Sequence, residues 1–222
     1  MKMIRRATFD DQSAISLLRI QEFKRANEFK LVKPECLLWD RHDEENVVLG
    51  AWDGPEPVST MRAVLVRNSA QATQSLQCTV PAQISYPAIV LNSGATQLGY
   101  RGTGLNSALR YYVLEAAIWD KIKTIIGPIY QGAPRTNFMQ KLGYVFMTPT
   151  KSWQNKLSPK KVRMLALLKE ARFHQAAMLI KTRRADILRE FPWSGEPIHF
   201  PPRSFFPQQR GRPKSRQKVS NR

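Results

Sequence analysis

An arginine and two glycines stand directly before a segment with the helical spacing of apolar residues. Arg101, Gly102 and Gly104 precede this segment, whose apolar residues are Leu105, Ala108, Leu109, Tyr112, Ala116 and Trp119. The first turn of a helix leaves backbone N–H groups without partners, and the aligned peptide dipoles add partial positive charge there. Glycine lets the backbone approach a phosphate closely, and arginine adds a charge-assisted contact. The stretch therefore predicts an anion site at a helix start; the alternative is a glycine turn into an ordinary core helix.

Two stretches of β-branched residues predict a hairpin upstream of this turn. Residues 46–52 (NVVLGAW) and 58–66 (VSTMRAVLV) are separated by DGPEP, a strong turn signal. Before the hairpin, residues 3–23 indicate a short strand and then a helix, with Asp10 or Asp11 as its cap. The chain thus begins as strand, helix and hairpin.

The segments on either side of the glycine turn predict further strands. Residues 68–100 contain no Asp, Glu, Lys or Arg; their first part indicates a loop, and residues 86–95 (YPAIVLNSGA) indicate a buried strand. Residues 124–130 (TIIGPIY) indicate another strand, in which Pro128 removes one hydrogen-bond donor and predicts an edge or a local opening. Residues 132–146 then indicate a turn, a short helix and a last strand. The order of these elements predicts an α/β fold.

Three motifs carry a resemblance to a known superfamily. YRGTGLNSAL resembles the acyl-donor motif of the GNAT acyltransferases, Arg/Gln-x-x-Gly-x-Gly/Ala, and FMQKLGYVF resembles their later segment, Phe/Leu-Tyr-Glu-Lys-Leu-Gly-Phe. The opening IRRATFDD is also typical of the superfamily, so the resemblance covers about residues 3–150. It implies a GNAT-like domain over residues 1–150, with a mixed, mostly antiparallel sheet flanked by helices.

The resemblance also implies a reaction and a donor site. GNAT proteins move an acyl group from a thioester to an acceptor, here expected to be an amine. The donor is acyl-CoA or the acyl-phosphopantetheine of an acyl carrier protein. By the same resemblance, its phosphate binds at Arg101, Gly102, Thr103, Gly104, Leu105, Asn106 and Ser107.

The chain departs from the superfamily pattern at positions that bear on catalysis. Asn106 stands where the motif has Gly or Ala, and Met139 stands where a tyrosine often protonates the leaving thiolate. The glutamate that often acts as general base on the preceding strand is missing. We therefore expect catalysis by positioning and by backbone N–H groups, with Asn92 and Ser93 orienting the nucleophile; alternatively, these two residues are satisfied polar groups at a strand end. A second hypothesis is a catalytically silent module that binds DNA or a protein through its basic C-terminal region.

One branch of the superfamily gives a further resemblance. RIQEFKRANEF and the following WDRHDEENVVLGAWDGPEPVSTMRAV resemble the N-acyl amino acid synthases and autoinducer synthases. Asp43 and Arg62 match an Asp before the hairpin and an Arg at its end in those proteins. The resemblance implies a fatty acyl donor on an acidic carrier protein, which a basic face would attract. The alternative is that Asp43 and Arg62 are surface charges flanking the hairpin.

The chain has a net charge of +18 that is concentrated toward its end. Residues 151–191 are predicted to form a basic helical extension that begins at Pro159, and residues 192–222 a proline-rich linker and a disordered basic tail. The tail contains Arg210, Gly211, Arg212 and Pro213, which match the core of the AT-hook. That motif predicts contact with the narrow, negative minor groove of A·T-rich DNA.

Composition argues against several other classes of protein. The two cysteines, Cys36 and Cys78, have no metal-ligand spacing and suggest a reducing compartment, so we expect a cytoplasmic protein. The histidines, His42, His174 and His199, have no second ligand nearby, and we expect no metal. The N-terminal residues do not resemble a signal peptide, and the apolar runs are too short for an integral membrane protein.

Overall fold

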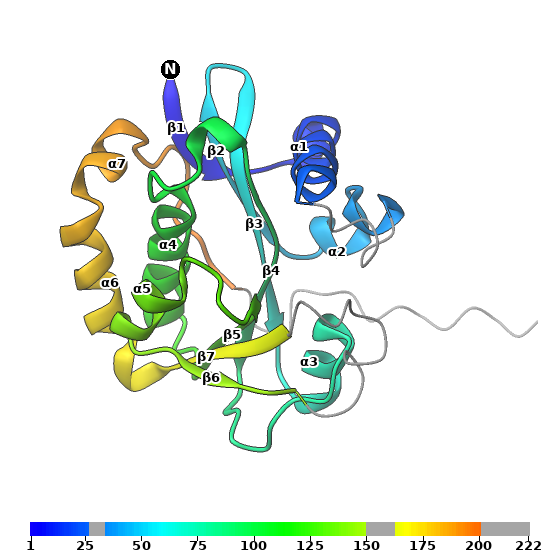
Figure 1. Cartoon of the computed structure of the whole chain (residues 1–222), viewed down its shortest axis with the longest axis vertical. Helices are drawn as coiled ribbons and strands as arrows, with labels where there is room; N and C mark the ends of the chain where they lie inside the picture. Colours follow the sequence, from blue (N-terminus) through cyan, green and yellow to red (C-terminus); the bar gives the residue numbers. More distant parts are fainter. Residues whose placement is uncertain (27–33, 150–162, 201–222) are drawn as a thin grey trace, which may run out of the picture.

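The computed structural model is built around one seven-stranded sheet (Figure 1). It describes residues 1–26, 34–149 and 163–200. The order across the sheet is β1-β2-β3-β4-β5-β7-β6. The strands are β1 (Lys2–Arg6), β2 (Val47–Asp53), β3 (Glu56–Val66), β4 (Ala88–Thr96), β5 (Thr124–Tyr130), β6 (Val145–Met147) and β7 (Arg163–Lys169). The α-helices are α1 (Gln12–Arg25), α2 (Arg41–Glu44), α3 (Ser69–Leu76), α4 (Leu105–Trp119), α5 (Thr136–Lys141), α6 (Phe173–Arg183) and α7 (Ala185–Glu190).

The sheet is mixed and mostly antiparallel, as the sequence predicts. The described strands pair in antiparallel fashion except β4 and β5, which are parallel. The predicted hairpin is confirmed as β2 and β3, with Gly54 at positive φ in its turn. Asp11 stands at the start of α1, but its carboxylate accepts from the Thr8 amide and pairs with Arg5 rather than capping the helix.

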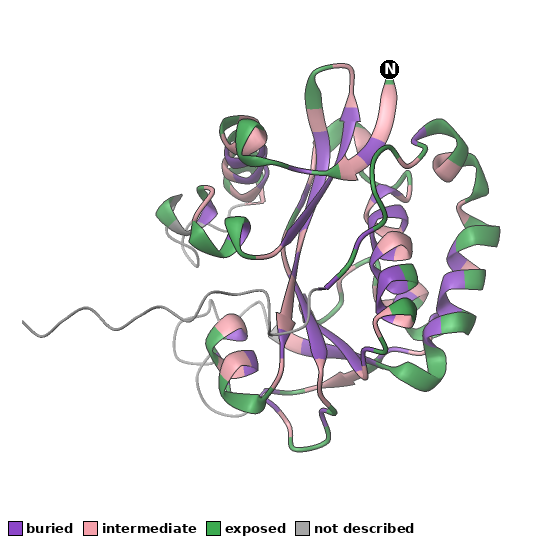
Figure 2. Ribbon diagram, turned by 180° about the vertical axis from the view of Figure 1, so that it is seen from behind, coloured by how far each residue is buried: buried purple, intermediate pink, exposed green. Residues whose placement is uncertain are grey.

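Helices cover both faces of the sheet. Figure 1 shows α4, α6 and α7 on one side and α1, α2 and α3 on the other. The buried stripe of α4 packs on the central strands and forms the main core, coloured purple in Figure 2. Leu105, Ala108 and Leu109 lie on this stripe as predicted, whereas Trp119 is 74% exposed because it ends the helix. The expectation that Trp119 belongs to the apolar face is wrong.

The two central parallel strands, β4 and β5, separate after a short contact. Their pairing covers Ala88–Val90 and Thr124–Ile126 and ends there. Pro128 follows this contact, in the part of β5 that has left β4. The opening predicted at Pro128 is thus confirmed, whereas an edge position is wrong, because β7 pairs along the other side of β5.

Two segments differ from the sequence-based expectation. Residues 69–76, expected as loop, form α3, because the Asn68 side chain accepts from the Gln71 amide and Ala72 and Leu76 are buried one turn apart. Residues 163–169, expected as helix, form β7 between β5 and β6. Both faces of β7 are buried, so its side chains form a continuous apolar run whose period does not distinguish strand from helix. The sheet therefore includes residues from both sides of position 150.

Part of the predicted C-terminal extension is helical, whereas residues 151–162 lie outside the described residues. Residues 173–183 and 185–190 form α6 and α7, and a break lies before Phe173. The predicted tail, including Arg210–Pro213, lies outside the described residues. Across the ranges that the structure describes, no helix has the length and apolar character needed to cross a bilayer.

Candidate active site

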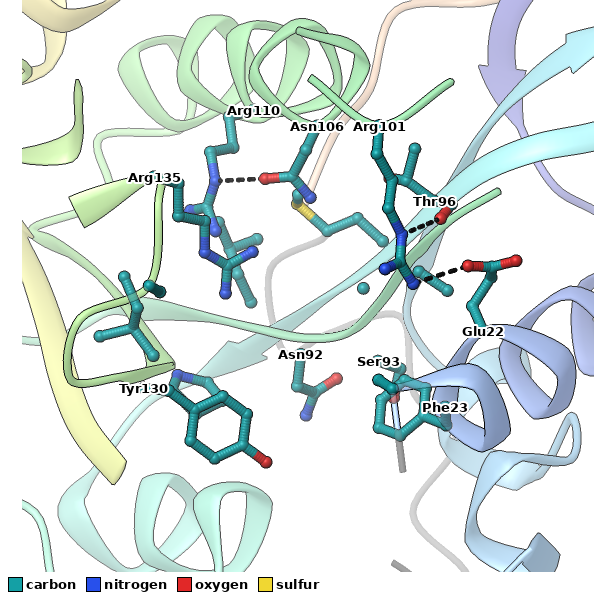
Figure 3. Close-up of a pocket in the computed structure, with 18 of the residues that line it drawn as sticks. Glu22, Phe23, Asn92, Ser93, Thr96, Arg101, Asn106, Arg110, Tyr130 and Arg135 are labelled. Atoms are coloured by element: carbon teal, nitrogen blue, oxygen red, sulfur yellow. Dashed lines mark hydrogen bonds and ion pairs between the residues drawn. The ribbon is translucent and has the colours of Figure 1, made fainter. Parts of the chain in front are cut away.

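A cavity of about 620 Å³ lies where β4 and β5 separate (Figure 3). The ends of these two strands, the start of α4, the end of α1 and part of α3 line it. Leu37 and Met61 also line it, so seven separate segments of the chain contribute to one cavity. In α/β proteins, small ligands usually bind in concave cavities of this kind.

An irregularity in β4 forms one wall of the cavity. Thr60 pairs with Ala95 and Arg62 pairs with Asn92, so Ser93 and Gly94 have no partner in β3. Ser93 has a φ of 50°, which is uncommon for a residue with a side chain. Such a bulge redirects the backbone and releases it from the ladder, as often happens beside active sites.

The backbone at the start of α4 offers six consecutive open N–H groups. Within residues 102–107, which the structure describes in full, no amide donates a hydrogen bond to another protein group. Gly102 and Gly104 adopt φ values of 80° and 105°, which turn the chain into the helix. Gly102 and Asn106 line the cavity, so this row of amides begins at its wall. The predicted anion site therefore has the required donors.

Arg101 lies at the cavity with its guanidinium engaged by a carboxylate. Its Nη2 is 2.7 Å from Oε2 of Glu22, and its Nε donates to the Thr96 carbonyl at 3.2 Å. The Arg101 side chain is still 44% exposed. Its remaining surface is accessible to a ligand anion.

Glu22 is the carboxylate in the cavity wall that sequence reasoning missed. Its side chain is 3% exposed, and its other oxygen pairs with Arg25 at 3.1 Å. The acid that the superfamily pattern places on the strand before the glycine turn is absent, and α1 supplies Glu22 from far along the chain. The available signal was spacing: Glu22 follows Ile15 and Leu18 on the buried face of α1.

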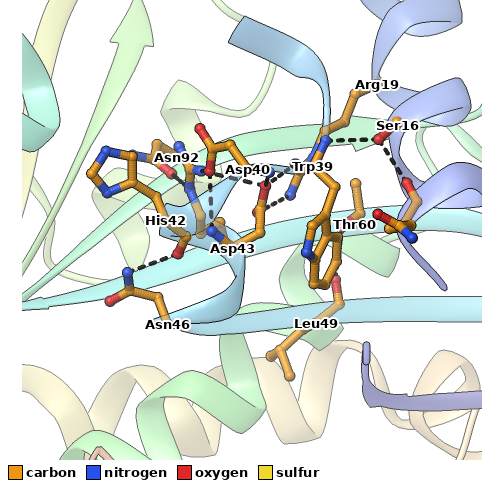
Figure 4. Close-up of polar contacts among 12 residues, drawn as sticks. Ser16, Arg19, Trp39, Asp40, His42, Asp43, Asn46, Leu49, Thr60 and Asn92 are labelled. Carbon is orange, nitrogen blue, oxygen red and sulfur yellow. Dashed lines mark hydrogen bonds and ion pairs between the residues drawn. The ribbon is translucent and has the colours of Figure 1, made fainter. Parts of the chain in front are cut away.

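Asp43 and Arg62 belong to an ion network that reaches the cavity wall at Asn92; Figure 4 shows Asp43 and Asn92 within it. Arg19 donates from both terminal nitrogens to Asp43 at 2.8 and 2.9 Å, and these side chains are 1% and 0% exposed. Arg62 Nη1 lies 3.1 Å from Asp40 and 3.5 Å from Asp43. Burial lowers the pKa of Arg62 below its usual value, and the Asp43 carboxylate opposes this shift. The alternative of two surface charges flanking the hairpin is wrong.

The network fixes the orientation of Asn92, which lines the cavity. Nε of Arg62 donates to Oδ1 of Asn92 at 2.9 Å, so the amide group of Asn92 is held with its oxygen toward the arginine. Its nitrogen lies 3.5 Å from the Ser75 hydroxyl. Asn92 can therefore present an N–H donor but no proton acceptor that titrates.

Arg110 brings a buried positive charge to the cavity wall. It is 8% exposed, and it donates hydrogen bonds to the neutral oxygens of Asn106 at 3.2 Å and Tyr144 at 3.3 Å. No carboxylate lies within ion-pair distance of Arg110 in the described residues. Arg135 lines the same side of the cavity (Figure 3). The positive side chains in this wall favour an anionic ligand.

The other predicted site residues take supporting positions. Thr103 donates from its hydroxyl to the Tyr100 carbonyl, and Leu105 is buried in the core. Met139 is also buried and does not line the cavity, whereas the phenol of Tyr130 does. Among the described residues, no group of three His, Cys, Asp or Glu side chains could hold a metal ion.

Comparisons with solved structures identify the fold. The chain is similar to BjaI, a CoA-dependent acyl-homoserine lactone synthase, with a TM-score of 0.61 and 17% identity over 86% of this chain and 91% of that one. It is also similar to an N-acetyltransferase from Staphylococcus aureus Mu50 (TM-score 0.52, 15% identity, 76% and 98% covered). An acyl-CoA N-acyltransferase from Pseudomonas aeruginosa gives a TM-score of 0.51 at 15% identity, with 75% and 97% covered. No protein-family model and no curated protein matches the chain.

These identities are low, so the similarity shows the fold rather than a particular activity. The seven-stranded mixed sheet flanked by helices is similar in fold to these solved acyltransferases, and the predicted α/β fold class is confirmed.

Proposed function

We propose that the protein transfers an acyl group from a thioester donor, acyl-CoA or an acyl carrier protein, to an amine acceptor. The observation that carries this proposal is the cavity at the split between β4 and β5, beside the six open amides of residues 102–107. An elongated donor with a phosphate at one end and a thioester at the other fits both features. BjaI was solved with isopentyl-CoA, so acyl-CoA is the first donor to test.

The start of α4 would hold the phosphate of the donor. Open amides at a helix N-terminus bind phosphate through hydrogen bonds and the helix dipole. Arg101 lies at the same turn and adds a charge-assisted contact from its exposed side. Arg101, Gly102 and Asn106 would thereby connect the phosphate site to the cavity.

Within the cavity, the acceptor amine would attack the thioester carbonyl. A C–N bond forms, the C–S bond breaks, and the thiolate departs with the proton that the amine loses. We assign Asn92 to orient the nucleophile and the backbone at Ser93 and Gly94 to stabilise the oxyanion. Both oxygens of Glu22 are occupied by Arg101 and Arg25. We therefore expect the ionisation of the acceptor amine to control the pH dependence of turnover.

Replacement of Gly102 tests the donor site against a matched control. Gly102 and Gly54 have φ values of 80° and 60°, and a Cβ at either position meets no atom within 4 Å. Gly102→Val and Gly54→Val therefore impose similar backbone strain, but only the first places a side chain at the open amides. We expect Gly102→Val to weaken acyl-CoA binding at least about tenfold, as measured by thermal shift and thiol release, while Gly54→Val does not.

Two results would contradict the proposal. One is a wild-type protein that releases thiol from no acyl-CoA or acyl carrier protein in the presence of amines. The other is equal loss of donor binding in the two glycine variants, which would reflect strain alone.

A further inference from the structure

We infer that Arg184, at the junction of α6 and α7, belongs to the donor site and binds a phosphate group of the donor's carrier. This inference rests on the proposed function and adds to it a residue from the C-terminal segment. No motif in the sequence pointed to Arg184, because it lies 80 positions after the glycine turn.

The packing of α6 brings Arg184 to the start of α4. Figure 1 shows α6 and α7 alongside α4. The face of α6 that carries Phe173, Ala177 and Ile180 is buried in the main core. Arg184 directly follows α6 and starts the turn into α7, so its position relative to α4 is fixed by this buried face.

The Arg184 side chain lies on Gly104 and needs the absence of a Cβ there. A Cβ built at Gly104 would be 2.6 Å from Cδ and 2.8 Å from Nε of Arg184. At Gly102, by contrast, a Cβ would meet nothing. The second glycine of the turn therefore provides space for an arginine that arrives from another part of the chain.

The electrostatic surroundings of Arg184 lack an anion. Its Nε is buried and has no hydrogen-bond partner, and its guanidinium lies 4.9 Å from the centre of the Phe138 ring. In the described structure no carboxylate pairs with it. The neighbouring helix start is itself partially positive, so the guanidinium and the dipole repel each other. An anion that accepts hydrogen bonds both from the guanidinium and from the helix amides would offset this repulsion and would give the buried Nε a partner.

A phosphate group has the chemistry that this arrangement requires. Its several oxygens can accept from backbone amides and from a guanidinium at the same time. Neither Gly104 nor Arg184 lines the cavity that would hold the thioester, so Arg184 would meet a part of the carrier that lies outside this cavity. That part of coenzyme A carries its phosphates.

Thioesters with and without phosphate test this assignment. The same acyl group is presented on coenzyme A, on phosphopantetheine and on pantetheine, which has no phosphate. We expect Arg184→Gln to raise KM about tenfold for the CoA thioester and to leave KM for the pantetheine thioester unchanged. The ratio of the two KM values is independent of the fraction of the variant that is folded. Arg184→Lys keeps the charge and should restore part of the effect.

The neighbouring arginine supplies the control. Arg183 is exposed on the last turn of α6, so Arg183→Gln removes the same charge without touching Gly104. An unchanged KM ratio in Arg184→Gln, or an equal change in Arg183→Gln, would overturn the assignment.

Calorimetric titration with coenzyme A separates the two proposals. Binding without thiol release contradicts only the proposed function, and no binding by the wild type contradicts both.

Discussion

The ion network behind Asn92 links the stability of the fold to the shape of the cavity. Arg19 and Asp43 are almost fully buried and are joined by two hydrogen bonds. Arg62 joins this pair to Asn92 in the cavity wall. Removing one member leaves its partner charged and buried, which costs more than removing both.

Replacement of Asp43 should therefore be strongly destabilising. We expect Asp43→Asn to lower the free energy of unfolding by about 3–5 kcal/mol, because Arg19 would remain buried without a counter-charge. Urea denaturation of both proteins gives this difference. Asp186→Asn breaks the exposed pair with Arg189 and should leave the free energy of unfolding unchanged. A loss in Asp43→Asn no larger than that in Asp186→Asn would show that the network is dispensable.

At the scale of residues, the sequence predicts a site made of chain neighbours better than it predicts contacts between residues that are far apart in the chain. The arginine and glycines at the start of α4 are neighbours in the chain, so their pattern alone predicts the open amides. Glu22 and Arg184 approach the same turn from distant positions, and only the packing of α1 and α6 shows this. Propensity and spacing do not encode such contacts.

At the scale of elements, whether the sequence predicts a strand depends on whether one or both of its faces are buried. The hairpin of β2 and β3 was predictable because a turn signal separates two β-branched stretches. β7 was not, because Leu165 and Leu167 face one cluster while Ala166 and Leu168 face another, and both sides are apolar. An apolar run without alternation has no hydrophobic periodicity that would distinguish a strand from a helix.

The backbones of β4 and β5 are still in close contact at Gly127, directly after their last paired residues. A Cβ at this position would lie 2.7 Å from the carbonyl oxygen of Leu91, directly after the last paired residues. We expect Gly127→Ala to reduce the free energy of unfolding by about 1–3 kcal/mol, as overpacking does. It should also change KM for the donor, because Leu91 lines the cavity.

Gly99 offers the control for this change. It has no positive φ, and a Cβ there would meet no atom within 4 Å, so Gly99→Ala should leave the urea midpoint unchanged. Equal midpoints for the Gly99 and Gly127 variants would mean that β4 can move away from β5 without cost.

At the scale of the whole molecule, positive charge increases along the chain. The first 150 residues have a net charge of +4, and the last 22 carry seven Lys or Arg and no acid. These last residues lie outside the described structure, so predictions about them rest on sequence. Truncation after Pro202 removes this charge while retaining every described element that lines the cavity.

We expect the tail to bind duplex DNA and the truncated protein to lose most of this binding. If all seven basic groups met phosphates, the salt slope of log affinity would approach about −6, from roughly −0.9 per neutralised phosphate. Thiol release from acyl-CoA should be the same in both forms. Full DNA binding by the truncated form would place the basic site on the preceding segments instead.

The two arginines of the AT-hook-like core should determine any preference for A·T-rich duplex. Changing Arg210 and Arg212 to Lys keeps the charge but replaces the planar guanidinium groups that fit a narrow minor groove. We expect this double variant to bind A·T-rich and G·C-rich duplexes equally, with the salt slope of the wild type retained. Titrations of both duplexes across a salt series measure preference and slope together. Equal affinity of the wild-type protein for both duplexes would reduce the tail to a polycation without groove recognition.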